Sequence, residues 1–356
     1  MKHISIVLLC LIFYSCTTVG KEENNVEIND MGIHEKTFIE INGLKQGMFI
    51  KGNDRNNPII LFLHGGPGMP TYGLTEKYPT YLEQDFIVCW WEQRGTGLSY
   101  SKSIKPEQLC VKDFVSDIFE LTEYLRKRFN KDKIYLMGHS WGSYIGLLAI
   151  KEKSELFHAY IGVGQITNPI ESEKLAYKYI LEQYKIMNNR KMVEKMEKHN
   201  FLDKNDYSVE YEKLRDNALD ELGIGMMHEM KSGFRGLYIP IMKNKEYTFS
   251  ERRNIWKGKS FYMNKTGLLE SIININLFEE IKSVDLPVYF FHGKYDYAVN
   301  YELAKEYCKM LESPIKGFYT FYNSAHSPIF EEPKIVRRIM MEDVIHLTNQ
   351  NSDKEI

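Results

Sequence analysis

The residues best suited to chemistry in this chain form a Gly-x-Ser-x-Gly turn at residues 138–142, with Ser140 at its centre. A serine hydroxyl is a weak nucleophile at neutral pH until a neighbouring base removes its proton. The two glycines permit a tight strand-to-helix turn that presents the serine above a sheet. The apolar run 134–137 precedes the turn, and a helical pattern follows from Ser143. This context predicts that Ser140 is a nucleophile.

The base and the acid for such a reaction are expected at two later strand ends. His326 follows the apolar run 318–322 and would lie at the carboxyl edge of the sheet, where open α/β sheets place their sites. Asp296 follows the run 288–291 and would fix the tautomer of the imidazole and stabilise its charged form. The chain order Ser140, Asp296, His326 is the order of the α/β-hydrolase triad.

A glycine-rich loop at residues 64–68, with the sequence His-Gly-Gly-Pro-Gly, follows the apolar run 58–63. Acyl transfer needs backbone N–H groups aimed at the developing oxyanion, and in this fold one comes from the residue after the nucleophile and one from such a loop. We therefore expect an oxyanion hole made by the N–H groups of Trp141 and Gly66. His64 is expected to brace the loop rather than to take part in chemistry.

The elements that position these residues are read from hydrophobic periodicity. Continuous apolar runs indicate strands buried on both faces, and helical patterns between several of them favour a doubly wound, mostly parallel sheet in the α/β class. A hairpin is expected to precede this sheet, with its turn at Asn42-Gly43. The predicted hairpin strands are 37–41 and 46–50, the buried strands include 58–63, 86–91, 133–137, 159–163 and 288–291, and helices are predicted at 114–129 and 144–151.

The strand–helix alternation stops between about residues 165 and 275. This stretch contains no buried-strand pattern, and apolar residues recur at helical spacing between Ala176 and Met187, which predicts an amphipathic helix. We interpret the segment as a mostly helical cap inserted into a hydrolase core. The predicted division is a signal peptide (1–16), a polar tether (17–34), the first part of the core (35–164), the cap (165–275) and the second part of the core (276–350).

The N-terminus has the pattern of an export signal. A basic start is followed by an apolar stretch, residues 4–14, that is too short to span a bilayer. The stretch ends at Ser15-Cys16 and resembles a bacterial lipoprotein signal, in which Cys16 would become the lipidated first residue. We expect an exported protein of the cell envelope, anchored at Cys16. Ordinary secretory cleavage, giving a secreted or periplasmic protein, and an unprocessed terminus are the alternatives.

Composition excludes several other classes. A net charge of −2, with 43% hydrophobic and 26% charged residues, is typical of a soluble globular protein and gives no field that would attract nucleic acid. Beyond the leader, Cys89, Cys110 and Cys308 are odd in number and widely spaced, so we expect neither a disulfide framework nor a zinc site. No metal or nucleotide motif follows a strand. We therefore expect no cofactor and no metal, and the sequence gives no prediction of oligomeric state.

At its motifs the chain resembles the prolyl iminopeptidase (proline aminopeptidase) family of serine peptidases. The matching pieces are residues 64–68, 92–99, 138–143, 292–296 and 324–326. Glu92 departs from the family, which usually has Asp at that position, and we expect this to shift a loop contact without abolishing catalysis.

The resemblance implies release of an N-terminal residue, classically proline, from a short peptide. It also implies that acidic groups of the cap bind the free amine of the substrate. The cap acids include Glu210, Glu212, Asp220, Glu221 and Glu229, but no spacing indicates which of them face a pocket.

Two other functions remain open. The same triad could serve a hydrolase of small esters or amides, because the cap determines the substrate and the fold does not. The fold could also act as a non-catalytic surface binding module, which the complete set of triad and oxyanion residues disfavours. The expected partner is a small peptide or another small molecule. No nucleic acid is expected, and contact with a membrane is expected only through the lipid anchor.

Overall fold

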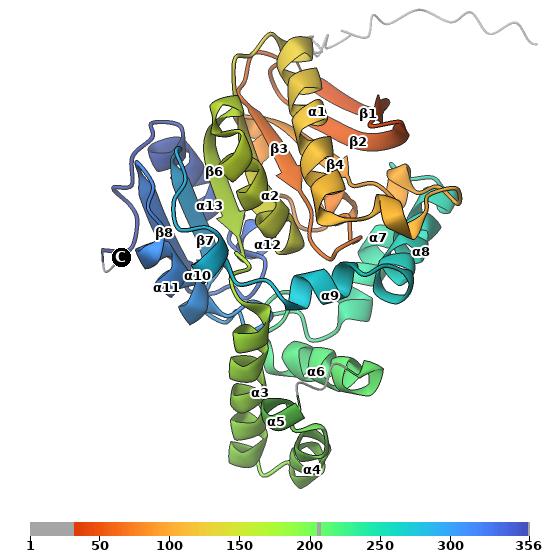
Figure 1. The fold of residues 1–356 in the computed structure, drawn as a ribbon, viewed down its shortest axis with the longest axis vertical. Helices are drawn as coiled ribbons and strands as arrows, with labels where there is room; N and C mark the ends of the chain where they lie inside the picture. The colour runs from red at the N-terminus through yellow and green to blue at the C-terminus, as the bar shows by residue number, and fades with distance from the viewer. Residues whose placement is uncertain (1–31, 205–207, 355–356) are drawn as a thin grey trace, which may run out of the picture. The chain divides into compact units, whose positions relative to one another are not determined.

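The computed structural model describes residues 32–204 and 208–354. Its core is one eight-stranded sheet in the order β1-β2-β4-β3-β5-β6-β7-β8 (Figure 1). Strand β2 pairs antiparallel with both of its neighbours, β1 and β4, and all the other pairs are parallel. The predicted α/β class with a mostly parallel sheet is therefore confirmed. The strands are β1 (Ile33–Ile41), β2 (Leu44–Gly52), β3 (Ile59–Leu63), β4 (Ile87–Glu92), β5 (Ile134–His139), β6 (Phe157–Val163), β7 (Val288–Gly293) and β8 (Lys316–Phe321).

The first two strands form the predicted hairpin. Asn42 and Gly43 make the turn with φ values of 49° and 71°, which are the left-handed conformations that a two-residue hairpin turn requires. Strand β1 begins at Ile33, so its first two residues fall within the segment predicted as a tether. Its pairing with β2 continues to Gly52, so the ladder is longer than the sequence pattern indicated.

The parallel strands are buried on both faces. In β3, Ile59, Leu61 and Leu63 belong to one hydrophobic cluster, and Ile60 and Phe62 belong to another. This division follows from the period of two along a strand, which sends successive side chains to opposite faces. Helices α1 (Val111–Phe129) and α2 (Trp141–Glu152) lie over one face of the sheet (Figure 1). Their buried side chains contribute to the first cluster.

The other helices of the core, several of them a single turn long, connect the strands of the sheet or follow the last strand. Helix α13 contributes Val336 and Ile339 to the second cluster, so each face of the sheet is covered by helices. The elements are η1 (Tyr72–Leu74), η2 (Leu82–Gln84), η3 (Gly97–Ser99), η4 (Pro106–Gln108), η5 (Ser154–Leu156), α10 (Leu277–Glu280), α11 (Tyr301–Met310), α12 (Pro328–Glu331), α13 (Pro333–Ile339) and η7 (Met340–Val344).

The described residues between 165 and 275 form helices and contain no strand. The first of these helices begins with the side chain of Asn168 accepting the N–H of Glu171, followed by Pro169, which is a favourable helix start. Several of the helices surround a separate small core that includes Tyr177 and Tyr211. The helices are α3 (Pro169–Ile186), α4 (Arg190–His199), α5 (Phe201–Lys204), α6 (Val209–Leu222), η6 (Phe234–Tyr238), α7 (Ile239–Lys243), α8 (Phe249–Lys265) and α9 (Leu268–Ile273).

The predicted signal peptide and Cys16 lie outside the described residues. Within the described part of the chain, no helix is both long and apolar enough to cross a membrane. Cys89, Cys110 and Cys308 are all free thiols.

Candidate active site

Ser140 occupies a strained turn between β5 and α2. Its backbone has φ 56° and ψ −121°, a region that a residue with a side chain rarely adopts. Helix α2 begins at Trp141, two residues earlier than predicted, because the turn passes directly into the helix. A side chain at Gly138 would overlap the carbonyl of Gly142, and one at Gly142 would overlap the carbonyl of Leu63. The two glycines of the motif are therefore required by close backbone packing.

Asp296 and His326 form a buried hydrogen-bonded pair. Nδ1 of His326 lies 2.8 Å from Oδ2 of Asp296, and the same carboxylate is 3.0 Å from Nε2 of His292. Its other oxygen accepts the N–H of Val299 at 2.8 Å. Burial opposes the charge, but the nearby His326 ring and the hydrogen bonds from His292 and His326 outweigh it and hold the pKa of Asp296 well below its ordinary value. The carboxylate is therefore charged at neutral pH.

Backbone contacts bring the Ser140 turn next to His326. The N–H of Ser140 donates to the carbonyl of Val163, the last residue of β6, at 3.0 Å. The next residue, Gly164, lies against the imidazole of His326, because a Cβ on this glycine would sit 2.7 Å from that ring. Nε2 of His139 also donates to the carbonyl of His326 at 3.0 Å. The three predicted triad residues thus follow the carboxyl ends of β5, β7 and β8, at one edge of the sheet.

His139 is a neutral structural histidine beside this pair. Burial first, and then the nearby His326 ring, lower the pKa of His139 to about 3. Its Nε2 therefore carries the proton that it donates to the His326 carbonyl. The sequence placed His139 inside the turn but gave no indication of this contact.

The glycine-rich loop lies directly against the candidate nucleophile. A Cβ on Gly65 would be 2.9 Å from the Cβ of Ser140, so only a glycine permits this approach. Gly66 follows with a φ of 117°, a conformation available almost only to glycine. The loop is closed by a hydrogen bond of 3.2 Å from the N–H of Met69 to the carbonyl of Gly65. Gly65 and Ser140 are therefore in contact. The predicted oxyanion donors, Gly66 and Trp141, are the residues that follow them in the chain.

A buried glutamine, Gln93, connects these two sides of the site. Its backbone N–H donates to Nε2 of His64 at 3.1 Å, and its side-chain amide donates to the His64 carbonyl at 2.9 Å. Its side-chain oxygen accepts the indole N–H of Trp141 at 2.9 Å. Burial lowers the pKa of His64 to about 4, so His64 is a neutral brace. Gln93 lies within the matching piece 92–99, but the sequence gives no indication of these contacts.

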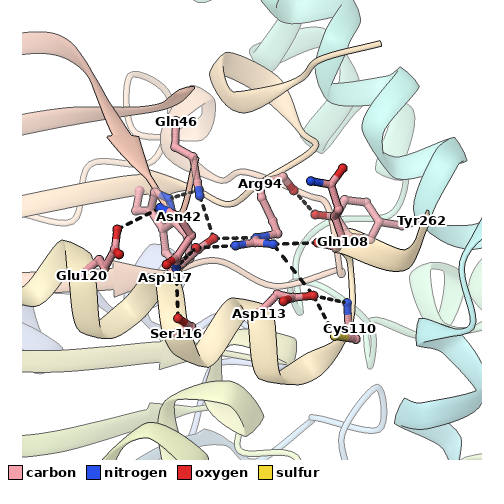
Figure 2. A network of polar contacts seen from close by, with 11 residues as sticks. Asn42, Gln46, Arg94, Gln108, Cys110, Asp113, Ser116, Asp117, Glu120 and Tyr262 are labelled. Carbon is pink, nitrogen blue, oxygen red and sulfur yellow. Dashed lines mark hydrogen bonds and ion pairs between the residues drawn. The ribbon is translucent and has the colours of Figure 1, made fainter. Parts of the chain in front are cut away.

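The neighbouring Arg94 is held in a buried ion pair. Figure 2 shows its guanidinium pointing to Asp117 of α1, with Nη2 2.5 Å from Oδ1 and Nε 2.6 Å from Oδ2. Asn42 and Gln46 donate to the same carboxylate, each at 2.7 Å. The carbonyl of Arg94 accepts the hydroxyl of Tyr262. The ring of Tyr262 packs against Gly68 of the 64–68 loop, where a larger residue would overlap it. The network therefore connects the hairpin, α1, the Gln93 segment and α8.

Glu92, the position that departs from the family, is buried and makes two loop contacts. Its Oε2 accepts the N–H of Leu98 at 2.6 Å, and its Oε1 accepts the hydroxyl of Tyr247, which lies between α7 and α8. Burial is the main cause that raises the pKa of Glu92 to about 7. The longer side chain thus forms a link between the core and the 165–275 segment, away from the triad contacts.

The five cap acids singled out in the sequence have varied surroundings. Glu210 and Glu229 are exposed. Glu221 accepts the hydroxyl of Tyr184, and Asp220 accepts a backbone N–H in the same segment. Burial is the main cause that raises the pKa of Glu212, which is half-buried. Among the contacts of the described residues, none joins these five side chains to the triad, so no amine-binding acid is assigned.

A family model described as the alpha/beta hydrolase fold matches residues 58–333. The chain therefore belongs to this family and is a hydrolase by fold. The probable aminopeptidase YbaC of Bacillus subtilis (strain 168) is 34% identical over 309 residues, which are 86% of this chain and 95% of that protein. A proline iminopeptidase of Heyndrickxia coagulans is 22% identical over 309 residues, covering 85% of this chain and 96% of the relative.

Solved structures agree in fold. The crystal structure of a proline iminopeptidase from Mycobacterium smegmatis matches with a TM-score of 0.65 and 12% identity, covering 88% of this chain and 98% of that chain. The resemblance to the prolyl iminopeptidase family that the motifs indicated is thus confirmed.

Proposed function

We propose that this protein is a serine aminopeptidase that releases an N-terminal residue, proline or a similar one, from short peptides. The observation that carries the proposal is the buried Asp296–His326 pair at 2.8 Å, beside a strained turn that presents Ser140. The names of the aminopeptidase and proline iminopeptidase relatives support a small peptide as the substrate.

The proposed reaction uses the triad as follows. His326 takes the proton of the Ser140 hydroxyl as its oxygen attacks the scissile carbonyl, and Asp296 stabilises the imidazolium that forms. The N–H groups of Trp141 and Gly66 donate to the negative oxygen of the tetrahedral intermediate. His326 then protonates the leaving amine as the C–N bond breaks, which leaves an acyl ester on Ser140. A water molecule, deprotonated by His326, hydrolyses this ester and regenerates the enzyme.

A hydrolysis panel tests the substrate class. We expect the purified protein to turn over aminoacyl amides with a free α-amine, proline and alanine among them, faster than the same compounds with an acetylated amine. A carboxylate facing a cationic amine in a closed site would give this preference. If simple esters were hydrolysed and every free-amine amide failed, the aminopeptidase proposal would be wrong and the small-ester hydrolase would take its place.

We further propose that the protein is exported and attached to the cell envelope by a lipid on Cys16. The basis is the short apolar stretch 4–14, followed by Ser15-Cys16 and a polar segment. Expressed with its full leader in a bacterial host, the Cys16→Ser variant is expected to leave the membrane fraction, whereas the wild-type chain stays in it. Equal membrane association of the two chains would contradict the anchor.

A further inference from the structure

Glu331, the last residue of α12, binds the loop that carries His326. Its Oε2 accepts the N–H of Ala325 at 3.0 Å, and the N–H of Ser327 also donates to the carboxylate. His326 thus lies between two residues whose backbones are held by one side chain. Through its other oxygen, the same carboxylate accepts the N–H of His228, which is 103 residues away in the chain.

His228 ends a short segment, residues 223–228, that contacts both loops of the candidate triad. The carbonyl of Ile224 accepts the N–H of Tyr297, the residue after Asp296, at 3.0 Å. The carbonyl of Gly225 accepts the N–H of His326 itself at 3.1 Å. The ring of His228 stacks on Tyr295 with a centroid separation of 3.8 Å and an interplanar angle of 11°.

We propose that Glu331 is a positioning residue that couples segment 223–228 of the cap to the acid and base loops, and so sets the place of His326. The inference rests on the proposed serine hydrolase function. Glu331 is suited to this task because an ionised carboxylate is only an acceptor, and its oxygens face backbone N–H donors from two distant parts of the chain. Substrate binding that moved the cap segment would therefore be transmitted to the base.

The coupling depends on the charge of Glu331. Burial is the main cause that raises the pKa of Glu331 to about 7, against the hydrogen bonds from His228, Ala325 and Ser327. As the pH falls through this value, the carboxyl gains a proton and one acceptor becomes a donor facing an N–H group. The titratable groups around it are Asp296, His326, His228 and Glu332. Catalysis should therefore fall on the acid side through Glu331, in addition to the loss that protonation of the general base causes in any such mechanism.

The test compares Glu331→Gln with the wild-type full chain. Glutamine keeps the size but turns an NH₂ group towards backbone donors. We expect the first-order rate constant for phosphonylation of Ser140 by a fluorophosphonate, in which fluoride leaves, to fall about ten- to a hundred-fold, the loss typical of a misplaced catalytic group. This rate constant is measured between pH 5.5 and 9. Its decline towards low pH, the acid limb, should follow two ionisations in the wild type and one in the variant. Rates are normalised to folded protein, measured by thermal melting.

Glu332→Gln is the matched comparison. The Glu332 carboxylate binds Asn323 and Ser324 of the same loop, at 3.0 and 2.7 Å, and among the described residues it makes no hydrogen bond to the cap. A threefold loss or less is expected, with the acid limb unchanged. If Glu331→Gln does not fold, Glu331→Asp replaces it and should react more slowly while keeping both ionisations.

The possible failures are distinct. The coupling would be wrong if Glu331→Gln labelled Ser140 at the wild-type rate and with the wild-type pH dependence. It would also be wrong if Glu332→Gln lost as much of the labelling rate as Glu331→Gln. Neither result would affect the proposed function. Absence of labelling at Ser140 in the wild type would instead overturn the proposed function.

Discussion

Replacing His326 with alanine is expected to lower kcat about 10⁴- to 10⁶-fold on the best substrate of the hydrolysis panel. We propose His326, whose Nδ1 lies 2.8 Å from the Asp296 carboxylate, as the base, and without a base the Ser140 hydroxyl keeps its proton at neutral pH. The measurement is steady-state turnover of the purified variant at saturating substrate.

The control for this change is His346→Ala. His346 is exposed, and it lies after the last core helices, so its loss should leave kcat within about twofold, as expected for a surface substitution. Thermal melting of both variants checks that they are folded. If His326→Ala kept more than a tenth of the wild-type kcat, His326 would not be the base.

Replacing Asp117 with alanine is expected to lower the free energy of unfolding by about 3–5 kcal/mol, because it removes the closer carboxylate partner of the buried Arg94 charge and leaves only Asp113, at 3.9 Å. Two further donors, from Asn42 and Gln46, lose the same acceptor (Figure 2). Urea denaturation at pH 7 measures the change. We also expect slower turnover in the folded fraction, because Arg94 is the chain neighbour of Gln93, which connects His64 to Trp141.

Glu120→Ala is the matched control, since Glu120 is on the same helix and also binds Asn42, at 2.8 Å, but is exposed. It should cost about 1 kcal/mol or less, the usual net value of a hydrogen bond. Equal losses for the two variants would mean that burial of the Arg94 pair adds nothing to stability.

The fold and the arrangement of the candidate triad could be predicted because their signals are local. Each buried strand is a short apolar run, and each candidate residue, such as Ser140 or Asp296, follows one of these runs within a few positions. In a parallel sheet the carboxyl ends of the strands meet at one edge, so chain order and strand ends were enough to bring these side chains together.

The remainder could not be predicted because it depends on contacts between distant segments. Tyr247 binds Glu92 and Tyr262 binds Arg94, across 155 and 168 residues, and neither partner lies in a periodic pattern that indicates the other. For the same reason, the periodicity of residues 165–275 predicted that this segment is helical, but it could not indicate which of its acidic side chains lie near Ser140.

Covalent labelling tests whether Ser140 is the nucleophile. The folded protein is treated with a fluorophosphonate, digested and analysed by mass spectrometry. We predict a single adduct on Ser140, complete loss of labelling in Ser140→Ala, and loss of labelling when the wild type is first unfolded in urea. If the folded wild type formed no adduct, Ser140 would not be the nucleophile. A stable adduct on another residue in both the wild type and Ser140→Ala would have the same meaning.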